Sequence, residues 1–361
     1  MSAEDKLYRD LQVHLDDQTI GFPATESGSD IRLLKQLFPA EQAKIAMFLT
    51  YKYETLEQIH ERAKKSGISM EELERGLDET ASRGVIGRRK KDGAKEYRNI
   101  PYIVGMAEAA ASNPTPELIQ AHTEYSEDGL FWNAFLTTEV PQMRTIPIEQ
   151  SITPEHHIGT YDEIKEIIET TDDPIVINEC VCRNGAQERG EPCKQTSRSE
   201  TCMAFRDGAK NCIESGRGRP ITKDEALEII RKNEEDGLVL QPSNAQLPEF
   251  ICSCCGCCCG ILNLHKAVPN PVEFWATNFY AEVTHELCKG CGTCEERCQT
   301  GAMFLDEEKE ISTVDLTRCL GCGLCVTVCP EGAIELRKKE AEVVPPLTAE
   351  DMFEVIMTNK K

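Results

Sequence analysis

The stretch LCKGCGTCEERCQTGAMFL, residues 287–305, recurs as RCLGCGLCVTVCPEGAIEL at residues 318–336, with an offset of 31 residues. Each copy carries four cysteines in the spacing Cys-x-x-Cys-x-x-Cys-x-x-x-Cys, with two glycines inside the run and a Gly-Ala step after it. Because both copies keep these residues at the same positions, the repeat predicts two similar metal-binding halves in one small domain.

The spacing of the cysteines has a physical reason. A [4Fe–4S] cube needs four thiolates directed at four corners, and three cysteines separated by two residues wrap a loop around three of them. The fourth corner is left to a more distant cysteine. Glycines let the backbone pass close to the sulfurs and direct N–H groups at them. Structural zinc uses pairs of cysteines, four ligands per ion, which fits two runs of four poorly.

On these motifs, residues 284–339 resemble the bacterial two-cluster ferredoxins, over about one-sixth of the chain. The resemblance implies two [4Fe–4S] clusters that pass single electrons, with each run lending its fourth cysteine to the other cluster. The implied ligand sets are Cys288, Cys291, Cys294 and Cys329, and Cys298, Cys319, Cys322 and Cys325. Gln299 stands where the family usually has proline, whereas Pro330 is kept. This position holds no ligand, so both clusters are expected.

Eleven further cysteines lie in the middle of the chain: Cys180, Cys182, Cys193, Cys202, Cys212, Cys252, Cys254, Cys255, Cys257, Cys258 and Cys259. Six of them fall within eight positions of the stretch ICSCCGCCCG, residues 251–260. Neighbouring side chains point in different directions, so core packing does not explain such a run. It predicts a further metal site with sulfur ligands, either an additional [4Fe–4S] cluster or zinc.

The expected ligands of this middle site fall into two groups. Cys180, Cys182, Cys193 and Cys202 form one possible four-thiolate site. Cys252, Cys254 or Cys255, Cys257 and Cys258 complete it or form another. Arg183 is placed to offset the negative charge of the thiolates. The region resembles uncharacterised cysteine-rich 4Fe–4S binding proteins of anaerobic bacteria, a resemblance that supplies no reaction.

The rest of the chain predicts an α+β multidomain protein. The expected divisions are an acidic flexible N-terminus at 1–30, a winged-helix-like domain at 31–105, a connecting segment at 106–150, a cysteine-rich α+β domain at 151–283, a two-cluster ferredoxin domain at 284–339 and a tail helix at 340–361. A helix at 40–52, two further helices that begin with capping boxes at Thr55 and Ser69, and a hairpin with the turn Asp92-Gly93 carry the resemblance to a winged helix. Its hairpin is basic, but its third helix is acidic, so nucleic acid is an unfavoured partner. A protein-docking or homodimerisation role is the alternative.

Composition limits the functional classes. The net charge is −22, from 62 acidic and 40 basic residues, which repels nucleic acids and anionic membranes and favours a partner with a basic patch. The first residues lack a signal-peptide core and no run is long enough to span a membrane, so a cytoplasmic, reducing location is expected.

Three functions follow. The preferred one is an electron carrier or electron-wiring subunit of an anaerobic oxidoreductase, with a reductase or dehydrogenase as partner. No Walker, Rossmann or hydrolase motif indicates a self-contained enzyme. A redox-sensing winged-helix transcriptional regulator is the main alternative. An enzyme that binds substrate at an open iron of the middle site is the third.

Overall fold

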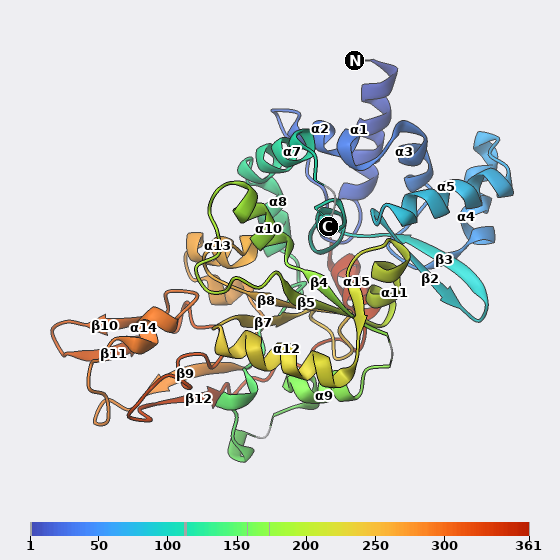
Figure 1. The fold of residues 1–361 in the computed structure, drawn as a ribbon. Coiled ribbons are helices and arrows are strands. Elements are labelled where there is room, and N and C mark those ends of the chain that lie inside the picture. Colours follow the sequence, from blue (N-terminus) through green and yellow to red (C-terminus); the bar gives the residue numbers. More distant parts are fainter. Residues whose placement is uncertain (1, 112–113, 157, 173, 361) are drawn as a thin grey trace. The chain divides into compact units, whose positions relative to one another are not determined.

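The computed structural model describes residues 2–111, 114–156, 158–172 and 174–360 (Figure 1). The chain divides into two compact units. The first comprises Met1–Glu139, Lys210–Arg217 and Phe353–Lys361, and the second comprises Val140–Ala209 and Gly218–Met352. The cysteine-rich and ferredoxin-like segments, expected as separate domains, therefore lie in one unit. Within the described part of the chain, every helix is too short or too polar to cross a membrane.

The first unit is mainly helical. Its first helix, α1 (Ala3–Asp16), begins with a capping box between Ser2 and Asp5. The apolar face of α1 is buried at Tyr8, Leu11 and Leu15. The segment 1–30, expected to be flexible, thus contains an ordered helix. Its apolar residues recur at helical spacing and pack into a core that composition alone does not reveal.

The other elements of the first unit follow in chain order. The helices are α2 (Ser29–Leu37), α3 (Ala40–Ala46), α4 (Leu56–Ala63), α5 (Met70–Ser82), α6 (Ala107–Ala110), α7 (Pro116–Glu127) and α8 (Leu130–Leu136), with parts of α11 (Arg206–Glu214) and α15 (Ala349–Asn359). The strands β1 (Glu54–Thr55), β2 (Ile86–Lys91) and β3 (Ala94–Asn99) form an antiparallel sheet in the order β1-β3-β2.

Helices α4 and α5 and the β2–β3 hairpin form where the sequence predicts them, whereas the helix predicted at 40–52 is shorter and ends, as α3, at Ala46. Capping boxes at Thr55 and Ser69 begin α4 and α5. The turn of the hairpin is Asp92-Gly93, with both residues at positive φ, as the sequence indicates. The order of elements agrees with a winged helix, and assignment to that family remains a prediction.

The tail helix packs inward. Met352, Phe353 and Ile356 of α15 are buried, and the Lys360 ammonium donates hydrogen bonds to the backbone oxygens of Gln18 and Thr19 at 3.1 Å. The predicted apolar face of this helix is therefore covered by the chain itself.

The second unit is built on a five-stranded antiparallel sheet in the order β6-β4-β5-β8-β7. Its strands are β4 (Ile175–Glu179), β5 (Glu200–Phe205), β6 (Arg219–Ile221), β7 (Val239–Pro242) and β8 (Phe250–Cys254). Helices α9 (Ile164–Glu169) and α12 (Lys223–Glu235) contact each other, and α12 packs on β4 and β5. The apolar residues Ile175, Val176 and Ile177 are all fully buried, because side chains on both faces of β4 are covered.

The remaining elements carry the cysteine loops. They are α10 (Val181–Glu188), α13 (Gly260–Ala267), α14 (Thr293–Arg297), β9 (Phe279–Val283), β10 (Met303–Asp306), β11 (Ile311–Val314) and β12 (Ile334–Lys338). Single-turn helices lie at Lys64–Ser66, Glu149–Ser151, Pro154–His156, Thr160–Asp162 and Pro271–Phe274. Strands β9 and β12 pair with each other, as do β10 and β11, both antiparallel.

Candidate metal centres

The eight C-terminal cysteines lie between β9 and β10 and between β11 and β12, seven of them on loops and Cys294 on the short helix α14. The β9–β12 pair joins the two ends of the ferredoxin-like segment, and the β10–β11 pair lies between the two cysteine runs. One apolar cluster lies beneath both runs. It includes Phe279, Ala281, Cys294, Ala302, Met303, Cys319, Cys325, Ile334 and Leu336. The pairing of first strand with last explains how a repeat 31 residues apart in sequence shares one core.

Backbone N–H groups are directed at the sulfurs. The pairs are Ser312 N to Cys288 Sγ at 3.4 Å, Ala281 N to Cys319 Sγ at 3.4 Å and Ala333 N to Cys329 Sγ at 3.2 Å. Such donors favour the thiolate form and tune the potential of a cluster bound to it. An all-thiol donor set with backbone donors is what a [4Fe–4S] cluster requires.

Two equivalent glycines let these loops pass close to other backbone. Gly290 and Gly321 have φ values of +63° and +60°. A Cβ on Gly290 would lie 2.2 Å from the carbonyl oxygen of Glu310, and one on Gly321 would lie 2.2 Å from that of Phe279. These positions need glycine both for the left-handed backbone and for the absent side chain.

The two expected ligand sets differ in exposure. Cys298, Cys319 and Cys322 lie close enough to interact electrostatically. Burial raises the pKa of Cys322 to about 12, and the negative forms of Cys298 and Cys319 contribute to the same shift. Cys325 interacts with the same three. In the first run, Cys291 is exposed and the Thr293 hydroxyl lowers the pKa of its thiol. The set around Cys291 is thus nearer to solvent than the set around Cys322.

Six of the middle cysteines form a second feature, a closed ring in which the charge state of each thiol is influenced by its two neighbours, here called the six-thiol ring. Around the ring the order is Cys180, Cys182, Cys259, Cys254, Cys252 and Cys202, which returns to Cys180. The ring is not tightly packed throughout, because among the described residues no three of its sulfurs lie within 4.8 Å of one another.

Strand register and helix starts explain the six-thiol ring. Met203 of β5 pairs with Ile251 of β8, so the antiparallel register places Cys202 across from Cys252. Cys254 follows two residues later on the same face of β8. Cys180 and Cys259 are the N-cap residues of α10 and α13, so the starts of these two helices bring their sulfurs into the ring.

The four remaining cysteines of the middle region, other than Cys212, form a compact group, here called the four-thiol group. All the Sγ atoms of Cys193, Cys255, Cys257 and Cys258 lie within 4.8 Å of one another. The Sγ–Sγ distances are 3.6 Å for Cys193–Cys255, 3.8 Å for Cys193–Cys257 and 3.6 Å for Cys257–Cys258. The pKa of Cys193 is lowered to about 7. Burial opposes this shift, and the backbone N–H groups of Thr196 and Gln195 outweigh it.

One buried cation serves both middle groups. Arg183 is 4% exposed and donates to the carbonyl oxygen of Ser253 at 2.7 Å and to the Thr201 hydroxyl. Burial by itself lowers the pKa of Arg183. The thiolate forms of Cys180, in the six-thiol ring, and of Cys255, in the four-thiol group, both raise it, and the net shift is upward. Its Nε atom has no hydrogen-bond partner among the described residues. The predicted charge-compensating position of Arg183 agrees with this geometry.

The structure groups the middle cysteines differently from the sequence-based expectation. Cys193 lies with the 255–258 cysteines, not with Cys180, Cys182 and Cys202, which join Cys252 and Cys254. Cys259, absent from the predicted ligands, completes the six-thiol ring. Its place in the cysteine run 252–259 was the sequence signal that could have identified it. Cys212 is on α11, in the part of that helix that belongs to the first unit.

Comparison with known proteins identifies one segment. The family model described as "4Fe-4S dicluster domain" matches residues 287–333. This match supports an iron–sulfur protein with a ferredoxin-type electron-transfer domain. No curated protein and no solved structure matches the chain.

Proposed function

We propose that this protein is an electron carrier or electron-wiring subunit of an oxidoreductase, with two [4Fe–4S] clusters in its C-terminal segment. The observation that carries the proposal is the pair of cysteine runs within the dicluster match, whose sulfurs accept backbone hydrogen bonds. Cys288, Cys291, Cys294 and Cys329 would hold one cluster, and Cys298, Cys319, Cys322 and Cys325 the other. Such clusters, when bound, supply one-electron transfer.

The chain's own residues provide the environment for this transfer. The apolar cluster around Phe279 and Leu336 excludes water from the Cys319 and Cys325 sulfurs. Around the other run, Leu287 and Phe304 are 48% and 41% exposed. Glu295 and Glu296, which directly follow Cys294 in this run, are also exposed. An exposed cysteine within an acidic surface favours electron entry or exit there, through a redox partner with a basic patch.

The six-thiol ring is the proposed location of a further cluster. It offers six sulfurs where a cluster needs four, and their wide spacing suits ligands that bind four different iron atoms. Arg183 beside the ring would offset the negative charge of bound thiolates.

Metal content and spectroscopy test the proposal. Anaerobically purified protein should contain about eight irons for two clusters and about twelve for three, with equal acid-labile sulfide. Reduction with dithionite should produce EPR signals of reduced clusters. The Cys322→Ser variant should lose about four irons, whereas Cys212→Ser should lose none. Colourless protein without labile sulfide would refute the electron-transfer function.

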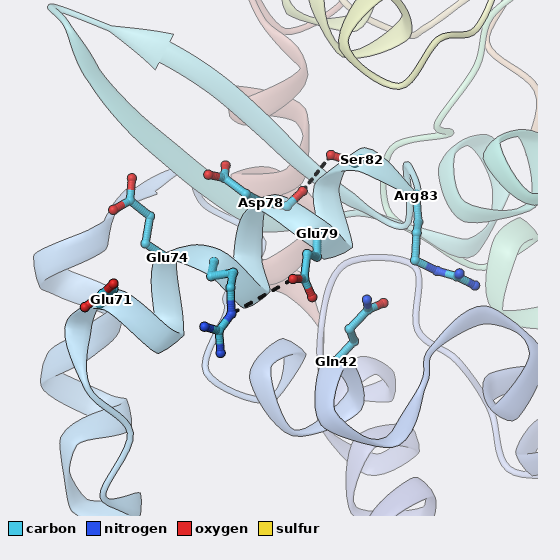
Figure 2. A pocket seen from close by; sticks show the side chains of 8 residues that line it. Gln42, Glu71, Glu74, Asp78, Glu79, Ser82 and Arg83 are labelled. Atoms are coloured by element: carbon cyan, nitrogen blue, oxygen red, sulfur yellow. Dashed lines mark hydrogen bonds and ion pairs between the residues drawn. The ribbon is translucent and has the colours of Figure 1, made fainter.

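The alternative, a DNA-binding redox sensor, is disfavoured by the charges of the first unit. Figure 2 shows acidic side chains along α5, where a groove-reading helix would lie; they include Glu71, Glu74, Asp78 and Glu79. Three of the hairpin cations, Arg88, Arg89 and Lys95, are paired with acids. Arg88 contacts Asp78 at 2.8 Å and Glu214 at 2.6 Å.

A gel-shift experiment separates the two functions. Oxidised, reduced and apo protein should all fail to bind DNA at low salt, the condition that most favours phosphate contacts. Binding in one redox state alone would support the regulator instead.

A further inference from the structure

We propose that the four-thiol group, Cys193, Cys255, Cys257 and Cys258, binds a single zinc ion, in a site separate from the six-thiol ring and the ferredoxin clusters. This inference is independent of the electron-transfer function, because it concerns none of the cluster ligands.

The sulfur spacing carries the proposal. Zinc binds thiolates at about 2.3 Å in a tetrahedron, so the sulfurs of a four-thiolate site lie about 3.8 Å apart. Three of the Sγ–Sγ distances are 3.6, 3.8 and 3.6 Å, and all the others lie within 4.8 Å. In a [4Fe–4S] cluster each sulfur binds a different iron atom, so the sulfurs necessarily lie farther apart.

The other cysteines of the same chain provide an internal comparison. Among the described residues, no three sulfurs of the ferredoxin runs or of the six-thiol ring lie within 4.8 Å of one another, whereas all four sulfurs of the four-thiol group do. The fold therefore holds this group at the spacing of one ion and spaces the cluster-type ligands more widely.

The surroundings of the four-thiol group suit a closed, structural site. Four thiolates around Zn²⁺ carry a net charge of −2, which needs compensation. Arg183 supplies a buried positive charge close to Cys255, and the backbone N–H of Lys194 donates to Cys257 Sγ at 3.5 Å. Four protein ligands leave no open position for substrate. Zinc also binds such sites more tightly than Fe²⁺ does, so it is the expected ion.

The site would also fix part of the ferredoxin-like segment. Gly256, inside the four-thiol loop, donates its N–H to Gln299 Oε1 at 2.8 Å, and Lys266 Nζ donates to the Gly256 carbonyl at 2.7 Å. A Cβ on Gly256 would lie 2.3 Å from the backbone oxygen of Gln299. Gln299 directly follows Cys298, so an ion that holds the four-thiol loop also holds the backbone next to a proposed cluster ligand. This hydrogen bond gives a structural reason for glutamine where proline is usual.

Zinc-edge X-ray absorption on the full chain tests the proposal. Protein prepared anaerobically with both iron and zinc supplied should contain about one zinc, with four sulfur neighbours at about 2.3 Å. Cys257→Ser should lose the zinc or replace one sulfur neighbour by a lighter atom, with iron and labile sulfide unchanged. The matched control, Cys212→Ser, should keep four sulfurs.

Three results would overturn the proposal. The first is protein without zinc in which Cys257→Ser lowers iron by about four, which would place a cluster here. The second is a single iron on these four cysteines. The third is zinc that keeps four sulfur neighbours in Cys257→Ser. Iron content and cluster EPR of the wild type report separately on the electron-transfer function, so either proposal can fail alone.

Discussion

Replacing Gly321 with alanine should remove one proposed ferredoxin cluster. Gly321 has φ +60°, and its backbone N–H favours the thiolate form of Cys319. Alanine costs about 1–2 kcal/mol in this left-handed conformation. Its Cβ would also lie 2.2 Å from the Phe279 carbonyl oxygen, more than 1 Å closer than an ordinary contact. Relieving this overlap moves backbone and costs about 1–3 kcal/mol more.

Gly332→Ala is the matched control. Gly332 lies in the same repeat at φ +59°, but nothing lies within 4 Å of a Cβ built there. The control therefore carries the conformational cost without the overlap. Iron and acid-labile sulfide per chain should fall by about four in Gly321→Ala and remain unchanged in Gly332→Ala. Equal iron content and equal thermal stability in the two variants would refute the reasoning.

Three other changes test the second unit. Asp162→Asn should lower the free energy of unfolding by about 3–5 kcal/mol in urea titrations, because it leaves the Arg144 side chain, 4% exposed, as an uncompensated buried charge. The control is Glu282→Gln, which breaks an exposed ion pair and should cost at most about 1 kcal/mol. An equally small loss in Asp162→Asn would contradict the prediction. Burial raises the pKa of Glu234 to about 7, so the folded state binds a proton more tightly than the unfolded state. The free energy of unfolding should therefore fall by up to about 3 kcal/mol as pH rises from 4.5 to 7, and Glu234→Gln should abolish that part of the pH dependence. Parallel stability–pH profiles of the wild type and Glu234→Gln would exclude this role of Glu234. Arg183→Gln should reduce the metal bound in the middle region and leave the ferredoxin EPR signals intact. The half-buried control, Arg198→Gln, should retain all metal. Identical metal content in the two variants would show that the thiol groups do not need the Arg183 charge.

The sequence by itself determined the ferredoxin-like segment. Its ligand spacing is local, since three of four ligands for each proposed cluster lie within seven residues, and its glycines recur at matching positions. Capped helices such as α4 and α5 were also readable, because a capping box involves residues three apart. The N-terminal segment, in contrast, forms the ordered helix α1 because Tyr8 and Leu11 are buried in a core formed by later parts of the chain.

The tertiary structure alone decided how the middle cysteines are divided. Cys202 lies opposite Cys252 because of the strand register between β5 and β8. Between the end of β5 at Phe205 and the start of β8 at Phe250 lie 44 residues. Cys193 reaches Cys255 across 62 residues of sequence. In the run 252–259, the adjacent pairs Cys254–Cys255 and Cys258–Cys259 are divided between the two groups, whereas Cys257 and Cys258 share one. A strand sends alternate side chains to opposite faces, and the turn that follows β8 redirects the rest. Spacing along the chain cannot specify such a partition, whereas the fold of the sheet does.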